Sequence, residues 1–255
     1  MRDLTGKLVW ITGAGTGIGE AGARRLAKAG CRLVLSGRRR EPLAGLAEQL
    51  KASGNEVAIE VLDVANRDAV IAAGERIAAD HGTVDILVNS AGINVPRRHW
   101  PEVSHDDWDA VVQINVNGLF YCTQAVLPAM RARKEGLVIN ISSWAGVRPS
   151  FLTGPAYTAA KHAVNALTES LNMEECVNGI RATAICPGEV STPIMDRRPV
   201  PMSPQDRARM VQPEDMGETI HFVAAMPPHV CLNQIVVSPT WNRGYVRYHQ
   251  ASGPE

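Results

Sequence analysis

Four glycines in the eight residues from Thr12 to Gly19 limit the fold of this chain more narrowly than any other feature. Residues 7–12, before this turn, are predicted to form a buried strand, and residues 18–30, after it, a helix that ends at Gly30. Glycine permits a tight turn and a close backbone approach, and the start of a helix stabilises an anion. The opening therefore predicts a strand, a turn suited to a phosphate group, and a helix.

The same alternation of short apolar runs and helical segments continues along the chain. Further strands are predicted at residues 32–36, 57–62, 85–89, 137–141, 180–186 and 234–237, and further helices from residue 41 and at 67–80, 104–131, 156–177 and 215–225. This alternation favours a parallel sheet covered on both faces. We expect one α/β domain over residues 1–255, a Rossmann-type, doubly wound fold with about seven parallel strands and helices on both faces. Residues 189–213 lack periodicity and are expected to form a substrate lid loop within this domain.

Charge and cysteine content argue against several classes of function. The 26 basic and 26 acidic residues balance, so no net field attracts nucleic acid or an anionic membrane. The five cysteines are scattered without metal-ligand spacing, and their odd number argues against a disulfide framework. The apolar run from Leu8 to Ile11 is too short for a signal sequence or a membrane span. We expect a cytoplasmic protein with no metal site, no nucleic acid partner and no membrane association.

The end of the second predicted strand bears on the choice between NAD and NADP. Folds that bind NAD place an acidic residue there, about 20 residues after the glycines, to hold the ribose 2′-hydroxyl. Here Gly37 occupies that position, and Arg38, Arg39 and Arg40 follow it. Guanidinium groups bind a 2′-phosphate through forked hydrogen bonds, so Arg38 and Arg39 predict NADP(H) as the cofactor. A solvated basic run is the other interpretation, and NAD(H) is then the alternative cofactor.

A candidate proton-transfer pair lies in the helix predicted at residues 156–177. Tyr157 and Lys161 are four residues apart, so their side chains share one face of that helix. A nearby ammonium favours the phenolate and lowers a tyrosine's pKa toward neutrality, which suits general acid–base chemistry. Ser142 and Ser143 follow the fifth strand at the carboxyl edge of the sheet, where open α/β folds bind ligands. A serine hydroxyl there is placed to hydrogen-bond a substrate oxygen.

Taken in order along the chain, these features resemble the short-chain dehydrogenase/reductase family. The glycine spacing matches that family, as do Asn89-Ser90-Ala91-Gly92 and Pro187-Gly188. The resemblance implies an NAD(P)-dependent enzyme that interconverts a carbonyl and a secondary alcohol on a small molecule by hydride transfer. It also implies the cofactor-binding residues Gly13, Thr16, Gly17, Ile18, Gly19, Arg38, Arg39, Asp63, Val64, Asn89, Ala91, Gly92, Tyr157, Lys161, Pro187, Gly188, Val190 and Thr192.

The same resemblance implies four catalytic residues. Tyr157 matches the general acid/base that gives a proton to a carbonyl oxygen or removes it from an alcohol. Lys161 matches the lysine that lowers the pKa of that tyrosine and hydrogen-bonds the nicotinamide ribose. Ser143, rather than Ser142, matches the residue that orients the substrate oxygen. Asn115 matches an asparagine that supports a water-linked proton relay to the lysine, and a polar residue on the wet face of a helix is the other interpretation.

Two segments depart from the common family pattern. Ser90 stands where the motif N-N-A-G has its second asparagine, a small change that we expect to leave cofactor binding intact. Residues 238–243 replace the usual V-D-G-G ending and resemble the branch that acts on small 3-hydroxy acids. The family expectation for assembly is a homo-oligomer, a tetramer or dimer, built on the two long helices.

Basic residues gather in the segments expected to border the substrate. They favour a small carboxylate, and exposed arginines on mobile loops are the other interpretation; the residues are Arg97, Arg98, His99, Arg148, Arg197 and Arg198.

Other functions remain as alternatives. They are an NAD-dependent alcohol dehydrogenase of the same family, an NADP(H)-sensing protein without catalysis, a scaffold protein, and a sugar-nucleotide epimerase or dehydratase. The intact set of Ser143, Tyr157 and Lys161 argues against a sensor. An epimerase or dehydratase typically has another glycine spacing and a larger substrate domain.

Overall fold

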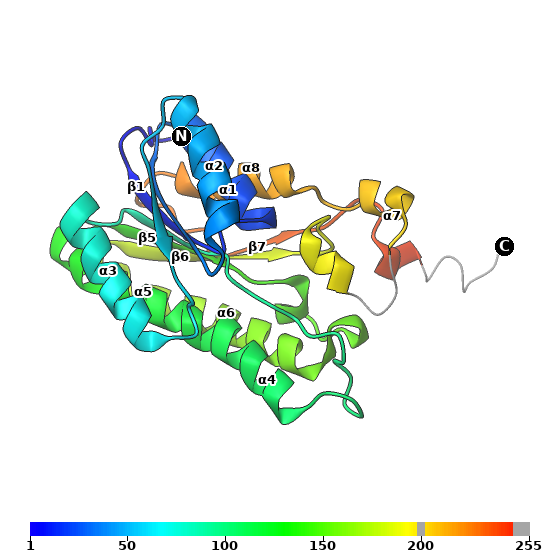
Figure 1. Ribbon diagram of the computed structural model, residues 1–255. Helices are drawn as coiled ribbons and strands as arrows, with labels where there is room; N and C mark the ends of the chain where they lie inside the picture. Colours follow the sequence, from blue (N-terminus) through cyan, green and yellow to red (C-terminus); the bar gives the residue numbers. More distant parts are fainter. Residues whose placement is uncertain (198–201, 247–255) are drawn as a thin grey trace.

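Seven parallel strands form a single sheet at the centre of the computed structural model, which describes residues 1–197 and 202–246 (Figure 1). The strand order is β3-β2-β1-β4-β5-β6-β7, and every pairing is parallel. The strands are β1 (Leu8–Thr12), β2 (Arg32–Gly37), β3 (Val57–Val61), β4 (Ile86–Asn89), β5 (Gly136–Ile141), β6 (Ile180–Pro187) and β7 (Gln234–Val237). The expected Rossmann-type sheet is confirmed.

Helices cover both faces of this sheet (Figure 1). On one face pack α1 (Gly17–Lys28), α2 (Arg40–Ala52) and α8 (Pro213–Ala224), through an apolar cluster that includes Leu26, Leu43 and Met216. On the other face pack α3 (Arg67–His81), α5 (Gly118–Arg133) and α6 (Gly154–Glu175), through a cluster that includes Ile77 and Val126. All five residues of β1 are buried, because a central strand of such a sheet has no face in water.

The predicted helix over residues 104–131 is confirmed as a continuous helical segment, with a π turn inside it that was not predicted. The structure has α4 (His105–Val112), a π-helical turn η1 (Gln113–Asn117) and then α5. Ser104 caps α4, since its hydroxyl accepts a hydrogen bond from the Asp107 amide at 3.1 Å. The wider π turn buries Asn115 rather than leaving it on a wet helix face. Apolar spacing predicts a helix here but does not distinguish an α from a π turn.

Residues 189–197 and 202–213, the described parts of the expected lid loop, contain more regular structure than their composition predicts. They include a 3-10 turn, η5 (Pro193–Arg197), and a short helix, α7 (Pro204–Ala208), which Ser203 caps. A parallel bridge joins Val190 to Val211, near the two ends of the segment. Both η5 and α7 begin with a proline and are only five residues long, so the sequence of this segment shows no apolar periodicity from which a helix could be predicted.

No helix within the described ranges is both long and apolar enough to cross a membrane.

Candidate active site

The carboxyl ends of β1 and β4 meet where the direction of strand order reverses. The chain runs outward from β1 through β2 to β3 and then returns to place β4 on the other side of β1. The Thr12 hydroxyl accepts hydrogen bonds from the amides of Ser90 and Ala91 at 3.2 and 3.3 Å and so ties the two strand ends together. Ligands of open α/β folds bind at such a reversal. The glycine turn therefore lies at the expected place for a cofactor.

The glycines of this turn are required by its geometry. Gly13 has a φ of +66°, and a Cβ on it would lie 2.8 Å from the Cα of Ala91. A Cβ on Gly19 would overlap the carbonyl oxygen of Gly13. Gly17 has a φ of +60°, and a Cβ there would lie 3.2 Å from the Thr192 methyl. The fold thus places Gly17 next to Thr192, which is far from it in the sequence. Both residues were predicted to bind the cofactor.

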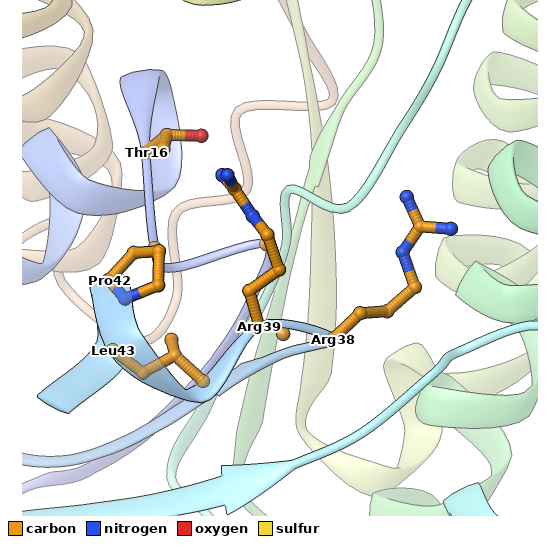
Figure 2. Close-up of a pocket in the computed structure, with 8 residues that line it drawn as sticks. Thr16, Arg38, Arg39, Pro42 and Leu43 are labelled. Atoms are coloured by element: carbon orange, nitrogen blue, oxygen red, sulfur yellow. The ribbon is translucent and has the colours of Figure 1, made fainter.

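A pocket of about 340 Å³ opens beside this turn (Figure 2). Figure 2 shows the side chains of Arg38 and Arg39 extending from the end of β2, with Arg39 reaching toward Thr16. Neither guanidinium forms an ion pair with another described residue. Both cations are therefore available to an anion in this pocket, which is lined by Gly13, Gly15, Thr16, Gly37, Arg38, Arg39, Pro42 and Leu43.

Asp63 and Val64 follow β3 and do not line this pocket. The Asp63 side chain is exposed, and its carboxylate accepts a hydrogen bond from the Ala65 amide at 3.0 Å. Val64 is buried, and a Cβ on Gly118 would lie 2.7 Å from its Cγ2. Their predicted contact with the cofactor stays a prediction.

Three of the predicted catalytic residues converge beside Gly92. A Cβ on Gly92 would lie 3.3 Å from the Asn115 side-chain oxygen and 3.7 Å from the Lys161 Nζ. The Lys161 Nζ lies 5.5 Å from the centre of the Tyr157 ring, as the four-residue spacing on one helix face predicts. Asn115 is held by two hydrogen bonds to Ile93, accepting from its amide at 2.8 Å and donating to its carbonyl at 2.9 Å. The π turn that presents Asn115 therefore also fixes the loop after β4.

Lys161 is a buried cation with 5% of its surface exposed. Its Nζ donates a hydrogen bond to the carbonyl oxygen of Ile141, at the end of β5, at 2.8 Å. Burial lowers the pKa of Lys161 to about 8, because desolvation penalises the ammonium. An ammonium in this position favours the charged form of a nearby phenol.

The two serines after β5 differ in their surroundings. Ser142 is buried, and its hydroxyl donates a hydrogen bond to the carbonyl of Lys161 at 3.2 Å. Ser143 is only partly buried, and its hydroxyl accepts a hydrogen bond from the Ala145 amide at 3.1 Å. That hydroxyl keeps its own hydrogen to donate, so Ser143 is the better placed of the two to contact a substrate oxygen.

Asn89 is buried at the end of β4, and its predicted contact with the cofactor stays a prediction. Its amide donates to the side-chain oxygens of Asn140 and Thr123 at 2.9 and 3.2 Å, and Asn140 donates to Thr168 at 2.9 Å. This buried chain links β4 and β5 to α5 and α6. Sequence reasoning missed Asn140, although an asparagine in the apolar run Leu137–Ile141 was a usable signal.

The segment after β6 is fixed by three long-range contacts. The Gly188 amide donates to the Val237 carbonyl at 2.7 Å, and Thr192 packs against Gly17. Glu189 forms a two-point ion pair with Arg243, which sequence reasoning missed. No local signal reveals this pair, because its members are 54 residues apart.

Of the basic residues expected near the substrate, Arg98 is buried at 6% exposure, whereas Arg97 and Arg148 are exposed. Arg98 lies against the start of α6, since a Cβ on Gly154 would overlap its carbonyl oxygen. The side chain of Arg197 and all of Arg198 lie outside the described residues. Among the residues that are described, no three His, Cys, Asp or Glu side chains gather as a metal site would require.

Comparison with known proteins gives consistent matches. Residues 7–200 match the family described as short chain dehydrogenase. An uncharacterized oxidoreductase of Staphylococcus aureus strain USA300 is 35% identical over 239 residues, which are 94% of this chain and 100% of that protein. An alcohol dehydrogenase from Thermococcus sibiricus, complexed with 5-hydroxy-NADP, superposes with a TM-score of 0.84 at 27% identity and covers 93% of this chain and 98% of its own. A serine dehydrogenase complexed with NADP+ has a TM-score of 0.82 at 33% identity, over 91% and 94% of the two chains.

Proposed function

The chain belongs to the short-chain dehydrogenase family, and on that premise we propose that it is an NADP(H)-dependent oxidoreductase that interconverts a carbonyl and a secondary alcohol on a small molecule. The observation that supports this most strongly is the convergence of Asn115 and Lys161 beside Gly92, with Tyr157 next to Lys161. An NAD-dependent alcohol dehydrogenase of the same family is the alternative.

The residues at the glycine turn fit NADP(H). The turn at the start of α1 is closely packed, since a Cβ on Gly13 would collide with Ala91 and one on Gly19 with the Gly13 carbonyl, and its Gly13, Gly15 and Thr16 line the pocket. The Arg38 and Arg39 guanidinium groups border the adjoining pocket, where they suit a 2′-phosphate. Three similar structures are complexes with NADP, NADP+ or 5-hydroxy-NADP. Bound NADP(H) would supply or accept the hydride at the reacting carbon.

The proposed proton chemistry follows from the side chains around Lys161. Tyr157 donates its phenolic proton to the carbonyl oxygen during reduction and removes the alcohol proton during oxidation. The Lys161 ammonium, held by the Ile141 carbonyl, lowers the pKa of that phenol. Ser143 donates a hydrogen bond to the substrate oxygen and stabilises its developing charge. Asn115 keeps the loop at Ile93 in place and lies near enough to Lys161 to support a water-linked proton path.

We propose a small hydroxy acid or its carbonyl form as the substrate class. Two observations support this choice: one similar structure is named serine dehydrogenase, and Arg98, whose backbone lies beside the start of α6, is a buried basic residue. NADP+ reduction with L-threonine, 3-hydroxybutyrate and 2-butanol tests it, because all three are secondary alcohols and only the first two carry a carboxylate. We expect kcat/KM for each of the two acids to be at least about tenfold higher than kcat/KM for 2-butanol, a difference of about 1.4 kcal/mol. Turnover of 2-butanol alone would overturn the carboxylate proposal and leave the oxidoreductase proposal intact.

We place the protein in the cytoplasm and assign it no nucleic acid or membrane partner. Its five cysteines are free thiols, which suits a reducing compartment.

The direct test of the reaction uses Tyr157→Phe. We expect kcat for NADPH oxidation with a carbonyl substrate to fall by at least about 100-fold, because the variant lacks the proton donor. The Kd for NADPH should stay within about twofold of the wild type. Tyr121→Phe is the control, since it removes a hydroxyl from a partly buried tyrosine on α5. Equal kcat in wild type and Tyr157→Phe would contradict the mechanism. A wild type that binds NADPH but turns over nothing would favour the sensor.

A further inference from the structure

The last described residues cross the carboxyl edge of the sheet instead of leaving it. We call residues 238–246, which follow the edge strand β7, the C-terminal strap. Pro239 lies against Gly188, where an added Cβ would be 3.2 Å from the proline ring. Asn242 is buried and turns the strap, since its side chain accepts from the Gly244 amide at 2.9 Å and its carbonyl accepts from Tyr245 at 2.9 Å. The strap therefore folds back over the end of β6.

Two side-chain contacts anchor the strap to the segment 189–213. The Arg243 Nε lies 2.8 Å from Glu189 Oε2, and its Nη2 contacts the other carboxylate oxygen. Both side chains of this pair are largely shielded from solvent, which strengthens a forked ion pair. The Arg209 guanidinium lies 4.7 Å from the Trp241 ring centre, a cation–π contact just after α7. In Figure 1 the strap lies beside α7, in agreement with this contact.

The third contact joins the strap to Trp144, the residue that follows the proposed catalytic serine. The Tyr245 ring meets the Trp144 ring edge-on, with centres 5.6 Å apart. Trp144 follows Ser143 directly. Tyr245 nevertheless keeps 50% of its surface exposed, and Trp241 keeps 46%. A segment that served only to fill the core would bury such aromatic side chains. These rings instead present free surface beside the site.

We propose that the C-terminal strap is a wall of the substrate site and sets the size of substrate that the site accepts. Tyr245 narrows the site from the side of Trp144, and it is the specificity-determining residue. Arg243 and Trp241 are positioning residues that hold this wall through Glu189 and Arg209. The inference rests on the proposed function and deepens it, because the wall borders the same catalytic serine.

The anchoring is tested without any substrate, by amide hydrogen exchange in Arg243→Ala. We expect residues 202–213 and 238–246 to exchange at least tenfold faster than in the wild type, while β1 and β4 stay unchanged. Arg25→Ala is the control, because the Arg25 Nε donates to both carboxylate oxygens of Glu218 and its side chain is 25% exposed against 28% for Arg243. Equal exchange in the two variants would overturn the anchoring and with it the proposal.

The size limit is tested with NADPH and two diketones that differ in bulk, 2,3-butanedione and 1-phenyl-1,2-propanedione. In Tyr245→Ala we expect the ratio of kcat/KM for the larger to the smaller diketone to rise at least tenfold, mainly through KM. Arg243→Ala should raise the ratio in the same direction, Arg243→Lys should partly restore it, and Arg25→Ala should leave it unchanged.

The two proposals fail in different ways. An active enzyme whose ratio is the same in wild type and Tyr245→Ala would overturn the strap as a wall and leave the proposed function standing. A wild type that binds NADPH but reduces neither diketone, and that does not oxidise L-threonine, 3-hydroxybutyrate or 2-butanol, would contradict the proposed function. The inference that rests on that function would then fall too.

Discussion

At the scale of single residues, Lys161 combines a buried ammonium with one backbone acceptor, the Ile141 carbonyl. Burial of a cation costs stability, because the folded chain must desolvate a charge that the unfolded chain keeps in water. The fold tolerates this cost at a position where the Lys161 Nζ lies 5.5 Å from the centre of the Tyr157 ring. The proposed proton chemistry, rather than stability, accounts for a buried cation there.

The lowered pKa of Lys161 predicts how stability depends on pH. Its value falls from 10.5 to about 8 on folding, so between these values the unfolded chain binds more protons than the folded one. The free energy of unfolding that Lys161 contributes therefore rises with pH across this window, by about 3 kcal/mol in all.

Urea unfolding at pH 7 and pH 10 measures the effect as the difference between wild type and Lys161→Met. The free energy of unfolding of the wild type minus that of Lys161→Met should be larger at pH 10 than at pH 7. The control is Lys28→Met, which removes an exposed lysine from α1. A difference that is the same at both pH values would show that burial does not shift the lysine.

Helical spacing is enough to predict that Tyr157 and Lys161 share a face, because it depends only on local geometry. The Glu189–Arg243 pair and the Asn89–Asn140 contact depend on the register of distant strands. In both cases the residues around one member of the pair do not indicate which distant residue is its partner. The sequence alone therefore could not predict these two contacts.

At the scale of elements, glycine is required in the turn between β1 and α1, whereas it is unfavourable inside the helix α2. Gly13 adopts a φ of +66° against Ala91, whereas Gly45 on α2 has nothing within 4 Å of an added Cβ. Alanine is disfavoured at a positive φ and favoured inside a helix. The same substitution should therefore have opposite effects at the two positions.

We expect Gly13→Ala to lower the free energy of unfolding by at least about 1 kcal/mol and to weaken NADPH binding by at least about tenfold. Gly45→Ala should raise the free energy of unfolding by about 0.5–1 kcal/mol and leave NADPH binding unchanged. Thermal unfolding and fluorescence titration measure both quantities. Normal NADPH affinity in Gly13→Ala would show that the turn does not approach the cofactor closely.

The sequence is sufficient to place most elements, because strands buried on both faces and helices with one apolar face have distinct patterns. The strand at Gln234–Val237 has the predicted bounds. The π turn η1 and the short helix α7 were not predictable in this way, since five-residue elements are too short for a period to show.

At the scale of the whole molecule, large apolar side chains remain exposed on the helices that the family resemblance associates with assembly. Phe120 on α5 and Met173 on α6 are both exposed, as are Phe222 on α8 and Val236 on β7. Exposed apolar patches mark interfaces in soluble proteins. We predict that the protein is a homotetramer or homodimer.

Size-exclusion chromatography with light scattering tests this assembly. The wild type should have two or four times the chain mass of 27.5 kDa, and Phe120→Glu should lower the mass. Phe151→Glu is the control, because Phe151 is also exposed but lies in the short turn η3 (Phe151–Thr153). A wild-type monomer would contradict the prediction.

The claim on which the account depends most is that Arg38 and Arg39 select NADP(H) over NAD(H). Fluorescence titration of NADPH and NADH against wild type, Arg38→Ala and Arg40→Ala tests it most directly, with Arg40 as the control because it does not line the pocket. The account predicts that NADPH binds at least about tenfold more tightly than NADH, that Arg38→Ala removes this difference of about 1.4 kcal/mol, and that Arg40→Ala keeps it. NADH binding as tight as or tighter than NADPH binding would contradict the account and favour the NAD-dependent alternative.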